Sequence, residues 1–325
     1  MGQTEATGFS EAQPGDVNET LARVSAGDRP IGTGLAPQAS GGACHCGSPG
    51  GKCTCEAATS NASNGGGVMT PSYVYAVGCI EPRCPQLAVE KELAQATGRA
   101  ETIRLTDKQA LHRVLSQPQN RYLVRQLCWV LTIEGLETYI LYPRDPVDLV
   151  QLIEAVRPTP SPLDVDVVIG IRGPIASPEV CNGLMVPIVV FDQLYAFDRE
   201  TLMKAIPRPE KMSAKQFETA AAELFERILQ MADNAGATDE QRALNYLAVR
   251  YPAIYALASE RYAQNNSLTS VEVRPSLLTG FRKIVEVIFA YTNRNTDVVE
   301  KFFVRVDVTE EFPFLNNKLS PYFDR

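Results

Sequence analysis

An α+β fold is predicted for this chain, with a mixed strand and helix subdomain followed by two helices and an antiparallel meander. Short strand-like runs alternate with short helical patterns up to about residue 208. Two amphipathic helical patterns follow, over 213–233 and 238–264. Three strand-length runs then succeed one another to the C-terminus, an order typical of helices beside an antiparallel sheet.

The N-terminal segment, residues 1–69, forms a Cys-, Gly- and Ser-rich arm that almost lacks large apolar residues. Such a composition cannot bury enough apolar surface to offset the entropy cost of ordering the chain, so we predict disorder there. Folded structure is expected to follow in two subdomains, over residues 70–208 and 209–325.

The first predicted elements are a strand and two helices. Ser72–Ile80 is a strand-length run of aromatic and β-branched residues. A helix is expected over Gln86–Thr97, where the following Gly98 is a C-terminal cap signal. Thr106 is a typical N-cap residue, and it precedes a predicted helix over about Asp107–Ser116.

A β-hairpin is predicted next. Leu127–Ile133 and Leu136–Tyr142 flank Glu134 and Gly135, and a two-residue turn ending in glycine suits the positive φ that such turns require. Asp145 and Pro146 then begin a helix to residue 156. Further strands are expected over 165–170, 185–190 and 195–197, and a short helix over 199–206.

The C-terminal subdomain begins with two predicted helices. One face of the 213–233 helix is apolar and consists of Phe217, Ala221, Leu224, Phe225, Ile228 and Met231. Thr238 and Gln241 form a capping-box signal at the start of the next helix, and Pro252 is expected to kink or divide it after Tyr251. Strands are predicted over 268–273, 284–291 and 301–308.

Composition excludes several classes of partner. The net charge is −7 and the pI is about 5.1, so no overall basic field favours nucleic acid or an anionic membrane. The longest apolar runs are far shorter than the roughly 20 residues of a membrane-spanning helix. The first 25 residues lack the features of a secretory signal, so we expect a cytoplasmic protein.

The eight cysteines are therefore expected to be thiols or metal ligands rather than disulfides. Cys128 and Cys181 are interpreted as isolated thiols. On the strand around 165–170, alternation with valine places Asp164 and Asp166 on the solvent face.

A motif in the second half of the chain carries a family resemblance. Its residues are Gly236, Thr238, Arg242, Ala243, Leu244, Asn245 and Tyr246, followed near the C-terminus by Asp307 and Val308. This pattern resembles the C-terminal, non-protease domain of PatG-type cyanobactin maturation proteins. An interpretation that needs no such function is that Arg242 and Asn245 tie their helix to neighbouring backbone.

The resemblance extends from about Tyr73 to the C-terminus. Val74–Gly78 is similar to the family's opening strand, but Cys79–Pro82 replaces the loop that follows it there. Tyr139 and Ile140 match the end of the family's hairpin, although Thr138 stands where the family has proline. Shorter matches lie at Val186–Val190 and at Tyr195, Ala196 and Phe197.

The resemblance implies an accessory, non-catalytic protein of a ribosomal-peptide pathway, which binds a precursor peptide, or a tailoring enzyme or protease of that pathway. Only two histidines occur, His45 and His112, and neither is placed as the base of a serine nucleophile. Aromatic side chains are expected to line a peptide groove reached by strand addition: Tyr73, Tyr75, Trp129, Tyr139, Tyr195 and Phe197. Ordinary core packing is the alternative for each. A metal-dependent peptide-modifying enzyme and a dimeric scaffold are the alternative functions.

Cysteine spacing suggests one cofactor, zinc, which the resemblance also implies without identifying its ligands. Cys44 and Cys46, followed by Cys53 and Cys55, supply four thiolates within twelve residues, enough for tetrahedral Zn²⁺. The alternatives are a Cys-rich tail without a fixed ligand, and an arm that imitates or serves as a substrate peptide. A second pair, Cys79 and Cys84, flanks a predicted proline-containing turn, and two small residues beside a turn are the alternative there.

Overall fold

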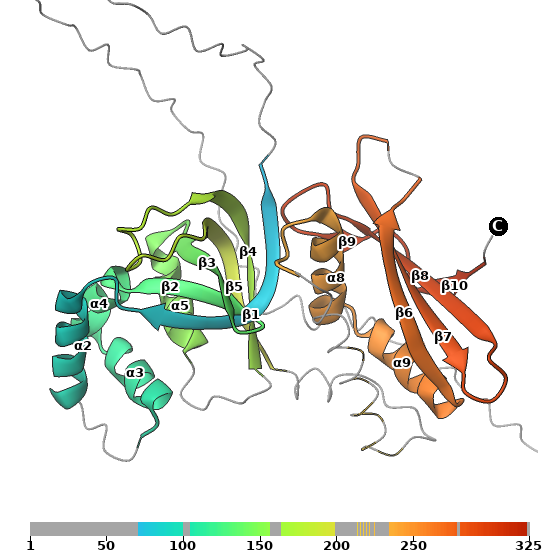
Figure 1. The fold of residues 1–325 in the computed structure, drawn as a ribbon, viewed down its shortest axis with the longest axis horizontal. Helices are drawn as coiled ribbons and strands as arrows, with labels where there is room; N and C mark the ends of the chain where they lie inside the picture. Colours follow the sequence, from blue (N-terminus) through green and yellow to red (C-terminus); the bar gives the residue numbers. More distant parts are fainter. Residues whose placement is uncertain are drawn as a thin grey trace, which may run out of the picture. The chain divides into compact units, whose positions relative to one another are not determined.

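Five strands close into a barrel in the first part of the described chain (Figure 1). The computed structural model describes residues 71–99, 105–156, 164–198, 234–277 and 280–323, together with residues 213, 215, 217, 219, 221 and 224. In the order in which they pair, the barrel strands are β1 (Tyr73–Arg83), β2 (Cys128–Ile133), β3 (Leu136–Pro143), β5 (Pro187–Asp198) and β4 (Asp164–Ile175). Strands β3 and β5 are parallel, and the other neighbours are antiparallel.

Strand β1 closes the barrel by changing partners along its length. Its first part, from Tyr73 to Gly78, pairs with β4, and its second part, from Cys79 to Arg83, pairs with β2. The change falls at Gly78, where a Cβ would overlap the carbonyl oxygen of Thr132. Glycine therefore permits the close approach of two backbones that the barrel corner needs. The proline-containing turn predicted between Cys79 and Cys84 is instead the end of this strand.

The β-hairpin is confirmed. Strands β2 and β3 are joined by Glu134 and Gly135, which have φ values of 50° and 80°. Both values are positive, as a two-residue turn matched to the strand twist requires.

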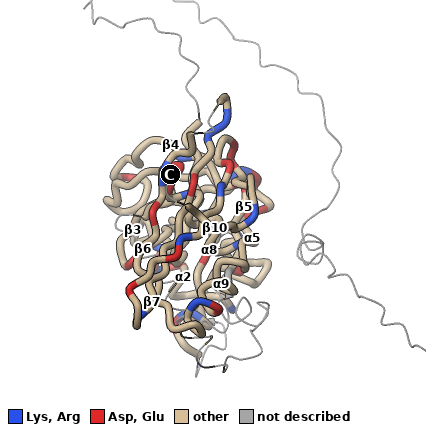
Figure 2. The backbone as a smooth tube through the Cα atoms, turned by 90° about the vertical axis from the view of Figure 1, so that its right-hand side faces the viewer, with Lys and Arg blue, Asp and Glu red and all other residues tan. Residues whose placement is uncertain are grey.

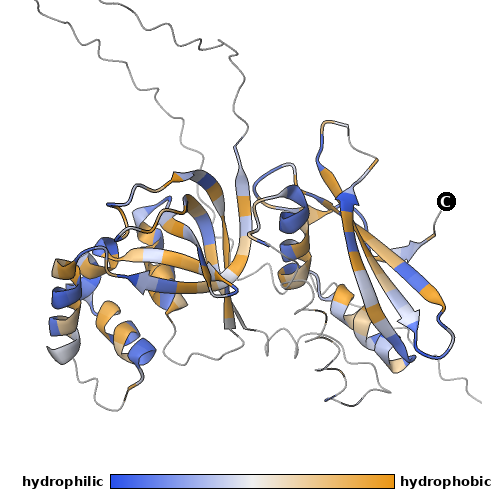
Figure 3. Cartoon of the chain, in the orientation of Figure 1, coloured by the Kyte–Doolittle hydropathy of each residue, from blue (hydrophilic) through white to orange (hydrophobic). Residues whose placement is uncertain are grey.

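Short helices cover one side of the barrel. They are α2 (Leu87–Arg99), α3 (Asp107–Leu115), η2 (Pro118–Asn120), α4 (Arg121–Gln126), η3 (Pro146–Asp148) and α5 (Leu149–Ala155). Their buried side chains, including Leu115, Leu123 and Leu152, share one core with Trp129 and Leu131 of the barrel. In Figure 3, apolar and polar residues alternate along the strands and divide the helix faces, as such layers require. The capping box of Thr106 and Gln109 starts α3.

Several elements differ from the sequence prediction. The helices η2 and α4 were not expected, because nine residues are too few to show a helical period. Only one long strand, β5, replaces the two strands predicted over 185–197. Its register against β4 shifts at Asp192, which is left without a partner between Phe191 and Gln193. This bulge interrupts the alternation, so the sequence looks like two strands.

The second part of the described chain is helical first and then antiparallel. It contains α8 (Asp239–Arg250), α9 (Ala253–Ala263), β6 (Asn266–Pro275), β7 (Ile284–Asn293), β8 (Val299–Asp307), β9 (Phe314–Leu315) and β10 (Ser320–Tyr322). The sheet order is β10-β8-β7-β6, with β9 paired to β8. Tyr251 and Pro252 divide the helical segment, and β6, β7 and β8 form the predicted meander, so the α+β class is confirmed.

One face of this sheet packs on helices, while the other carries charged pairs. Side chains of β7 and β8, such as Val287 and Val304, share a core with α8, α9 and the helical residues Phe217, Ala221 and Leu224. On the opposite face, the buried Glu286 accepts hydrogen bonds from Arg274 and Arg305. Acidic and basic residues are interspersed along the chain (Figure 2).

Some predictions concern residues that the structure does not describe. The arm over residues 1–69 and the helix over 199–206 lie outside the described residues, as do Phe225, Ile228 and Met231. Where the structure does describe the chain, no helix is both long enough and apolar enough to cross a membrane.

Candidate functional site

The motif residues of α8 meet strand β1 of the barrel. We call this region the seam: strand β1, the segment 234–238 and helix α8, with Tyr195 of β5. Gly236 has a φ of 68°, and its carbonyl oxygen accepts a hydrogen bond of 2.9 Å from the amide of Tyr75. A Cβ at this position would overlap the carbonyl of Tyr75 and lie 2.8 Å from the Cα of Ala76. Only glycine therefore satisfies both the conformation and the close approach.

Asn245 holds the same residue of β1, Tyr75, through its backbone carbonyl. Its Nδ2 donates to the carbonyl oxygen of Tyr75 at 2.8 Å. Its Oδ1 accepts a hydrogen bond of 2.8 Å from Nδ2 of Asn234. Because Asn245 is fully buried, these bonds replace the water that its amide loses on folding.

Arg242 reaches in the opposite direction, toward the chain after β8. Only 2% of it is exposed. Its guanidinium donates to the carbonyl of Val308 at 2.8 Å and to the carbonyls of Glu310 and Glu311. Burial lowers the pKa of Arg242, while the nearby Asp239 carboxylate raises it. The interpretation that Arg242 and Asn245 tie their helix to neighbouring backbone is confirmed.

Aromatic rings and arginines alternate across the seam. The Arg242 guanidinium lies 5.2 Å from the ring centre of Tyr73, and that of Arg250 lies 4.7 Å from the ring centre of Tyr195. Between them, Tyr75 and Tyr246 pack edge to face at 6.3 Å. The hydroxyls of Tyr75 and Tyr195 are hydrogen-bonded at 2.9 Å. Burial raises the pKa of both tyrosines, so both remain neutral donors at physiological pH.

Three of the six predicted groove residues are core residues. Tyr75, Trp129 and Tyr139 are 1%, 3% and 2% exposed, so they do not line a peptide groove. The indole Nε1 of Trp129 donates to the carbonyl of Val124, and the hydroxyl of Tyr139 donates to the carbonyl of Ala235. These partners satisfy the polar ends of buried rings.

The other three predicted groove residues lie on β1 and β5, the two strands that contribute to the seam. Tyr73 and Tyr195 are half-buried beside arginines of α8. The backbone of Phe197 pairs with Val165 in β4, and its side chain lies outside the described residues.

The predicted pair of Cys79 and Cys84 does not form a loop site. Both are thiols, and Cys79 lies within strand β1 while Cys84 directly follows it. Four residues of extended chain lie between them, a span of about 16 Å that is too long for both to bind one metal ion. Burial raises the pKa of the Cys84 thiol. Cys44, Cys46, Cys53 and Cys55 lie outside the described residues. Among residues that are described, no three His, Cys, Asp or Glu side chains gather around a common point.

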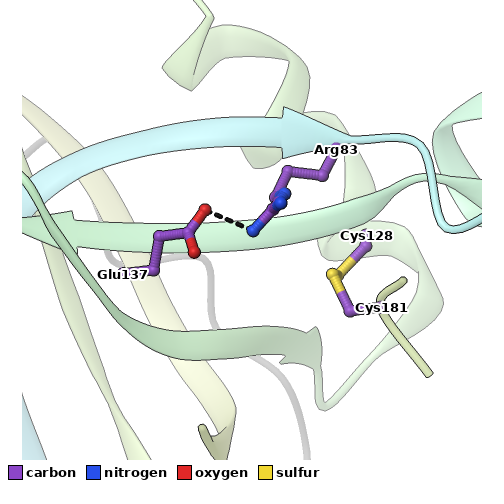
Figure 4. Close-up of a disulfide and its surroundings, with 4 residues drawn as sticks. All are labelled: Arg83, Cys128, Glu137 and Cys181. Carbon is purple, nitrogen blue, oxygen red and sulfur yellow. Dashed lines mark hydrogen bonds and ion pairs between the residues drawn. A yellow bond between two sulfur atoms is a disulfide. The ribbon is translucent and has the colours of Figure 1, made fainter. Parts of the chain in front are cut away.

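Cys128 and Cys181 are not isolated thiols but form a disulfide (Figure 4). Their Cα atoms are 5.7 Å apart although 53 residues separate them in sequence. The bridge joins the start of β2 to the loop between β4 and β5, beside Val130, Ile140 and Ala176. Figure 4 also shows the neighbouring ion pair of Arg83 and Glu137. Sequence alone cannot show this pairing, because folding brings the two cysteines together.

Asp166 was predicted on the solvent face of its strand but is only 1% exposed. Its Oδ2 accepts a hydrogen bond of 2.9 Å from the amide of Ile80. Asp166 pairs with Gly78, where β1 leaves β4 for β2, so an aspartate there supplies an acceptor that the strand ladder no longer provides. The side chain of Asp164 lies outside the described residues.

A pair of carboxylates beside the seam, Asp192 and Glu311, had no signal in the sequence. Asp192, at the bulge of β5, forms a 2.8 Å ion pair with Arg144. Glu311, in the segment that Arg242 holds, lies against Asp192. Burial, followed by the hydrogen bond and charge of Asp192, raises the pKa of Glu311 to about 7, and Arg144 and Arg242 act in the opposite direction. The two carboxylates are more than 100 residues apart along the chain.

Comparisons with known proteins agree with this architecture. The family described as PatG C-terminal matches residues 211–322. A solved structure titled "PatG Domain of Unknown Function" matches with a TM-score of 0.64 and 18% identity, over 78% of this chain and 99% of that chain. A search of curated proteins found no match. This chain therefore carries a PatG-like C-terminal domain over residues 211–322, in a fold that it shares with the PatG domain of unknown function.

Proposed function

We propose that the protein is a non-catalytic accessory of a cyanobactin-like ribosomal-peptide pathway, and that it captures a precursor peptide or an extended segment of a partner enzyme. The PatG-like domain supports the choice of pathway. Ribosomal peptides are made in the cytoplasm, and the proposal places the protein there.

The free edge of strand β6 carries the proposal. Within the described chain, this ten-residue strand pairs with β7 on one side and with no strand on the other. The barrel, by contrast, is closed. A free edge presents a row of backbone donors and acceptors, and an extended peptide can pair with them as an added strand.

The side chains of β6 provide a basis for selecting a peptide. Val271 and Val273 point to the helix-covered face and are only partly buried. Ser270 and Glu272 point to the other face and are exposed. An added strand with alternating apolar residues would extend the apolar layer over the two valines, while main-chain hydrogen bonds would supply sequence-independent affinity.

The non-catalytic assignment is supported by the contacts of the motif residues, which lie within the fold. Arg242 and Asn245 donate hydrogen bonds to backbone carbonyls inside the fold. Tyr75 and Tyr195 bond to each other rather than presenting a hydroxyl to a substrate. These groups position the barrel on α8, which is a structural role.

The proposal is tested by calorimetric titration of the protein with a cyanobactin-type precursor peptide, with and without a chelator. We expect binding that survives chelation and that protects β6 amides from hydrogen exchange. Val273→Lys places a charge in the expected apolar layer and should weaken binding at least ten-fold. Ser270→Lys adds the same charge to the opposite face of the strand and should leave binding unchanged.

Two results would overturn the proposal. Absence of binding at high micromolar peptide concentration would refute peptide capture. Conversion of the peptide by the purified protein alone would show catalysis, and loss of that conversion on chelation would favour the metal-dependent enzyme.

A further inference from the structure

A small apolar pocket lies between α4 and the segment formed by η3 and α5. Its volume is about 250 Å³. Val124 and Ile153 form its buried floor, and Val147 and Val150 on its rim are 66% and 47% exposed. Single exposed apolar residues are common on protein surfaces, but apolar pockets are few. Exposed valines beside an apolar pocket therefore suggest a binding site.

Two arginines of α4 flank the pocket. Arg121 and Arg125 both line it, and both are exposed. They are four residues apart, so their side chains lie on the same face of the helix. No ion pair or hydrogen bond joins either guanidinium to another residue of the described part of the chain. Their charge and donors are therefore available to a ligand.

We propose that this pocket, together with Arg121 and Arg125, binds an acidic peptide segment that inserts one aliphatic or aromatic side chain. Pockets for whole small molecules usually have volumes of about 300–1,000 Å³, so a smaller pocket fits an anchoring side chain better. A buried anchor of this kind commonly supplies most of the affinity of a peptide interface. Carboxylates beside the anchor match the planar, two-pronged donors of arginine.

This inference rests on the proposed function and assigns the peptide a second contact, on the helices beside the barrel. Strand addition at β6 depends on hydrogen bonds to the peptide backbone and therefore selects weakly among peptide sequences. The pocket would add selection through one apolar side chain and its acidic neighbours. Charge complementarity would also accelerate encounter, and the effect should weaken with salt.

The first test uses a phage-displayed library of random twelve-residue peptides, selected on the full-length protein. The wild-type protein should enrich peptides with Asp or Glu on either side of an apolar residue. The double variant Arg121→Glu/Arg125→Glu should lose this enrichment and favour Lys and Arg instead. The control is Lys91→Glu/Lys318→Glu, which changes the net charge equally at two exposed lysines outside the pocket. It should select the same peptides as the wild-type protein.

The second test measures affinity by fluorescence anisotropy with one enriched peptide, made with and without its acidic residues. The Arg121→Glu/Arg125→Glu variant and Val150→Asp should each weaken binding of the acidic peptide at least ten-fold. The lysine control should remain within about two-fold of the wild-type protein. Circular dichroism and the melting temperature verify that every variant is folded.

The outcomes separate this inference from the proposed function. Enriched peptides that bind equally well to the pocket variants would overturn the pocket assignment and leave peptide capture at β6 standing. An equal loss with the lysine control would reduce the effect to net charge and overturn the pocket as a site. Failure of the wild-type protein to enrich any peptide, together with absence of precursor binding, would overturn both.

Discussion

At the scale of single residues, the seam shows how buried polar side chains specify one arrangement of the chain. Arg242 satisfies carbonyls after β8, and Asn245 satisfies the carbonyl of Tyr75 in β1. The two residues lie on one helix but serve different parts of the molecule. Each is costly to bury without partners, so each stabilises only the fold that supplies them.

Replacing Arg242 should be strongly destabilising. In Arg242→Met, the buried carbonyl of Val308 and the partly buried carbonyl of Glu311 lose their donors. We expect a loss of about 2–4 kcal/mol in the free energy of unfolding, measured by urea denaturation. Arg242→Lys keeps the charge but not the fork of donors, so its loss should lie between those of Met and wild type. Equal stability of Met and wild type would refute the role assigned to Arg242.

The carboxylate of Glu311 should make stability depend on pH. Its pKa in the folded protein is raised to about 7, above its ordinary value of 4.5. The folded protein therefore favours the protonated carboxyl. The resulting contribution to the free energy of unfolding is present at low pH and is lost as the pH rises through about 7. Glu311→Gln should flatten the dependence of the urea midpoint on pH between 5 and 8. The exposed neighbour Glu310, changed to Gln, is the control, and parallel profiles for all three proteins would contradict the assignment.

The sequence predicted the roles of Arg242 and Asn245 better than those of the aromatic residues. A polar residue inside an apolar helical stripe must find partners, so its structural role can be inferred. Strand β1, however, is covered on both faces: Val74 faces the barrel core, and Tyr75 faces α8. A continuous run of aromatic and β-branched residues does not reveal whether its aromatic face meets a bound peptide or another layer of the protein, so Tyr75 was wrongly placed in a groove.

At the scale of elements, the helix caps and the hairpin turn were predicted correctly, whereas the pairings between distant segments were not. The capped helices α3 and α8 and the hairpin turn at Glu134 and Gly135 depend on residues within four positions of each other. The bulge in β5 and the disulfide depend on pairings between distant segments. Sequence patterns record the first kind of constraint directly, whereas the second arises only from the complete fold.

The disulfide should stabilise the loop between β4 and β5. Removing the Cys128–Cys181 crosslink by Cys181→Ser should lower the free energy of unfolding by about 2–4 kcal/mol, since a crosslink restricts the unfolded chain. A reductant should destabilise the wild-type protein by a similar amount and have no further effect on the variant. Cys79→Ser, which leaves the disulfide intact, should keep the wild-type response to reductant. A variant as stable as the oxidised wild type would contradict this expectation.

At the scale of the whole molecule, the segment 234–238 and α8 join the barrel to the C-terminal sheet. The same helix contributes Asn245 to β1 and Leu244 and Leu247 to the core under the sheet. Loss of this joint should therefore affect both parts at once.

Gly236→Ala tests that joint. Its positive φ and its contact with the backbone of Tyr75 both oppose a Cβ. Gly183 has a φ of 86° but has no atom within 4 Å of an added Cβ, so Gly183→Ala measures the backbone strain alone. We expect about 1 kcal/mol for Gly183→Ala, and a clearly larger loss with broader, less cooperative unfolding for Gly236→Ala. Equal losses in calorimetry would show that the close approach does not matter.

The bonds between β1 and the segment around α8 also have a consequence for synthesis on the ribosome. Tyr75 is made early, but its hydrogen-bond partners Gly236 and Asn245 follow about 160 and 170 residues later. At 5–20 residues per second, roughly 8–35 s pass before β1 can acquire them. During that interval the face of β1 that carries Tyr75 is not yet packed against α8. The barrel should therefore reach its native form only after α8 has left the exit tunnel, and truncated chains ending before residue 234 should be prone to aggregation.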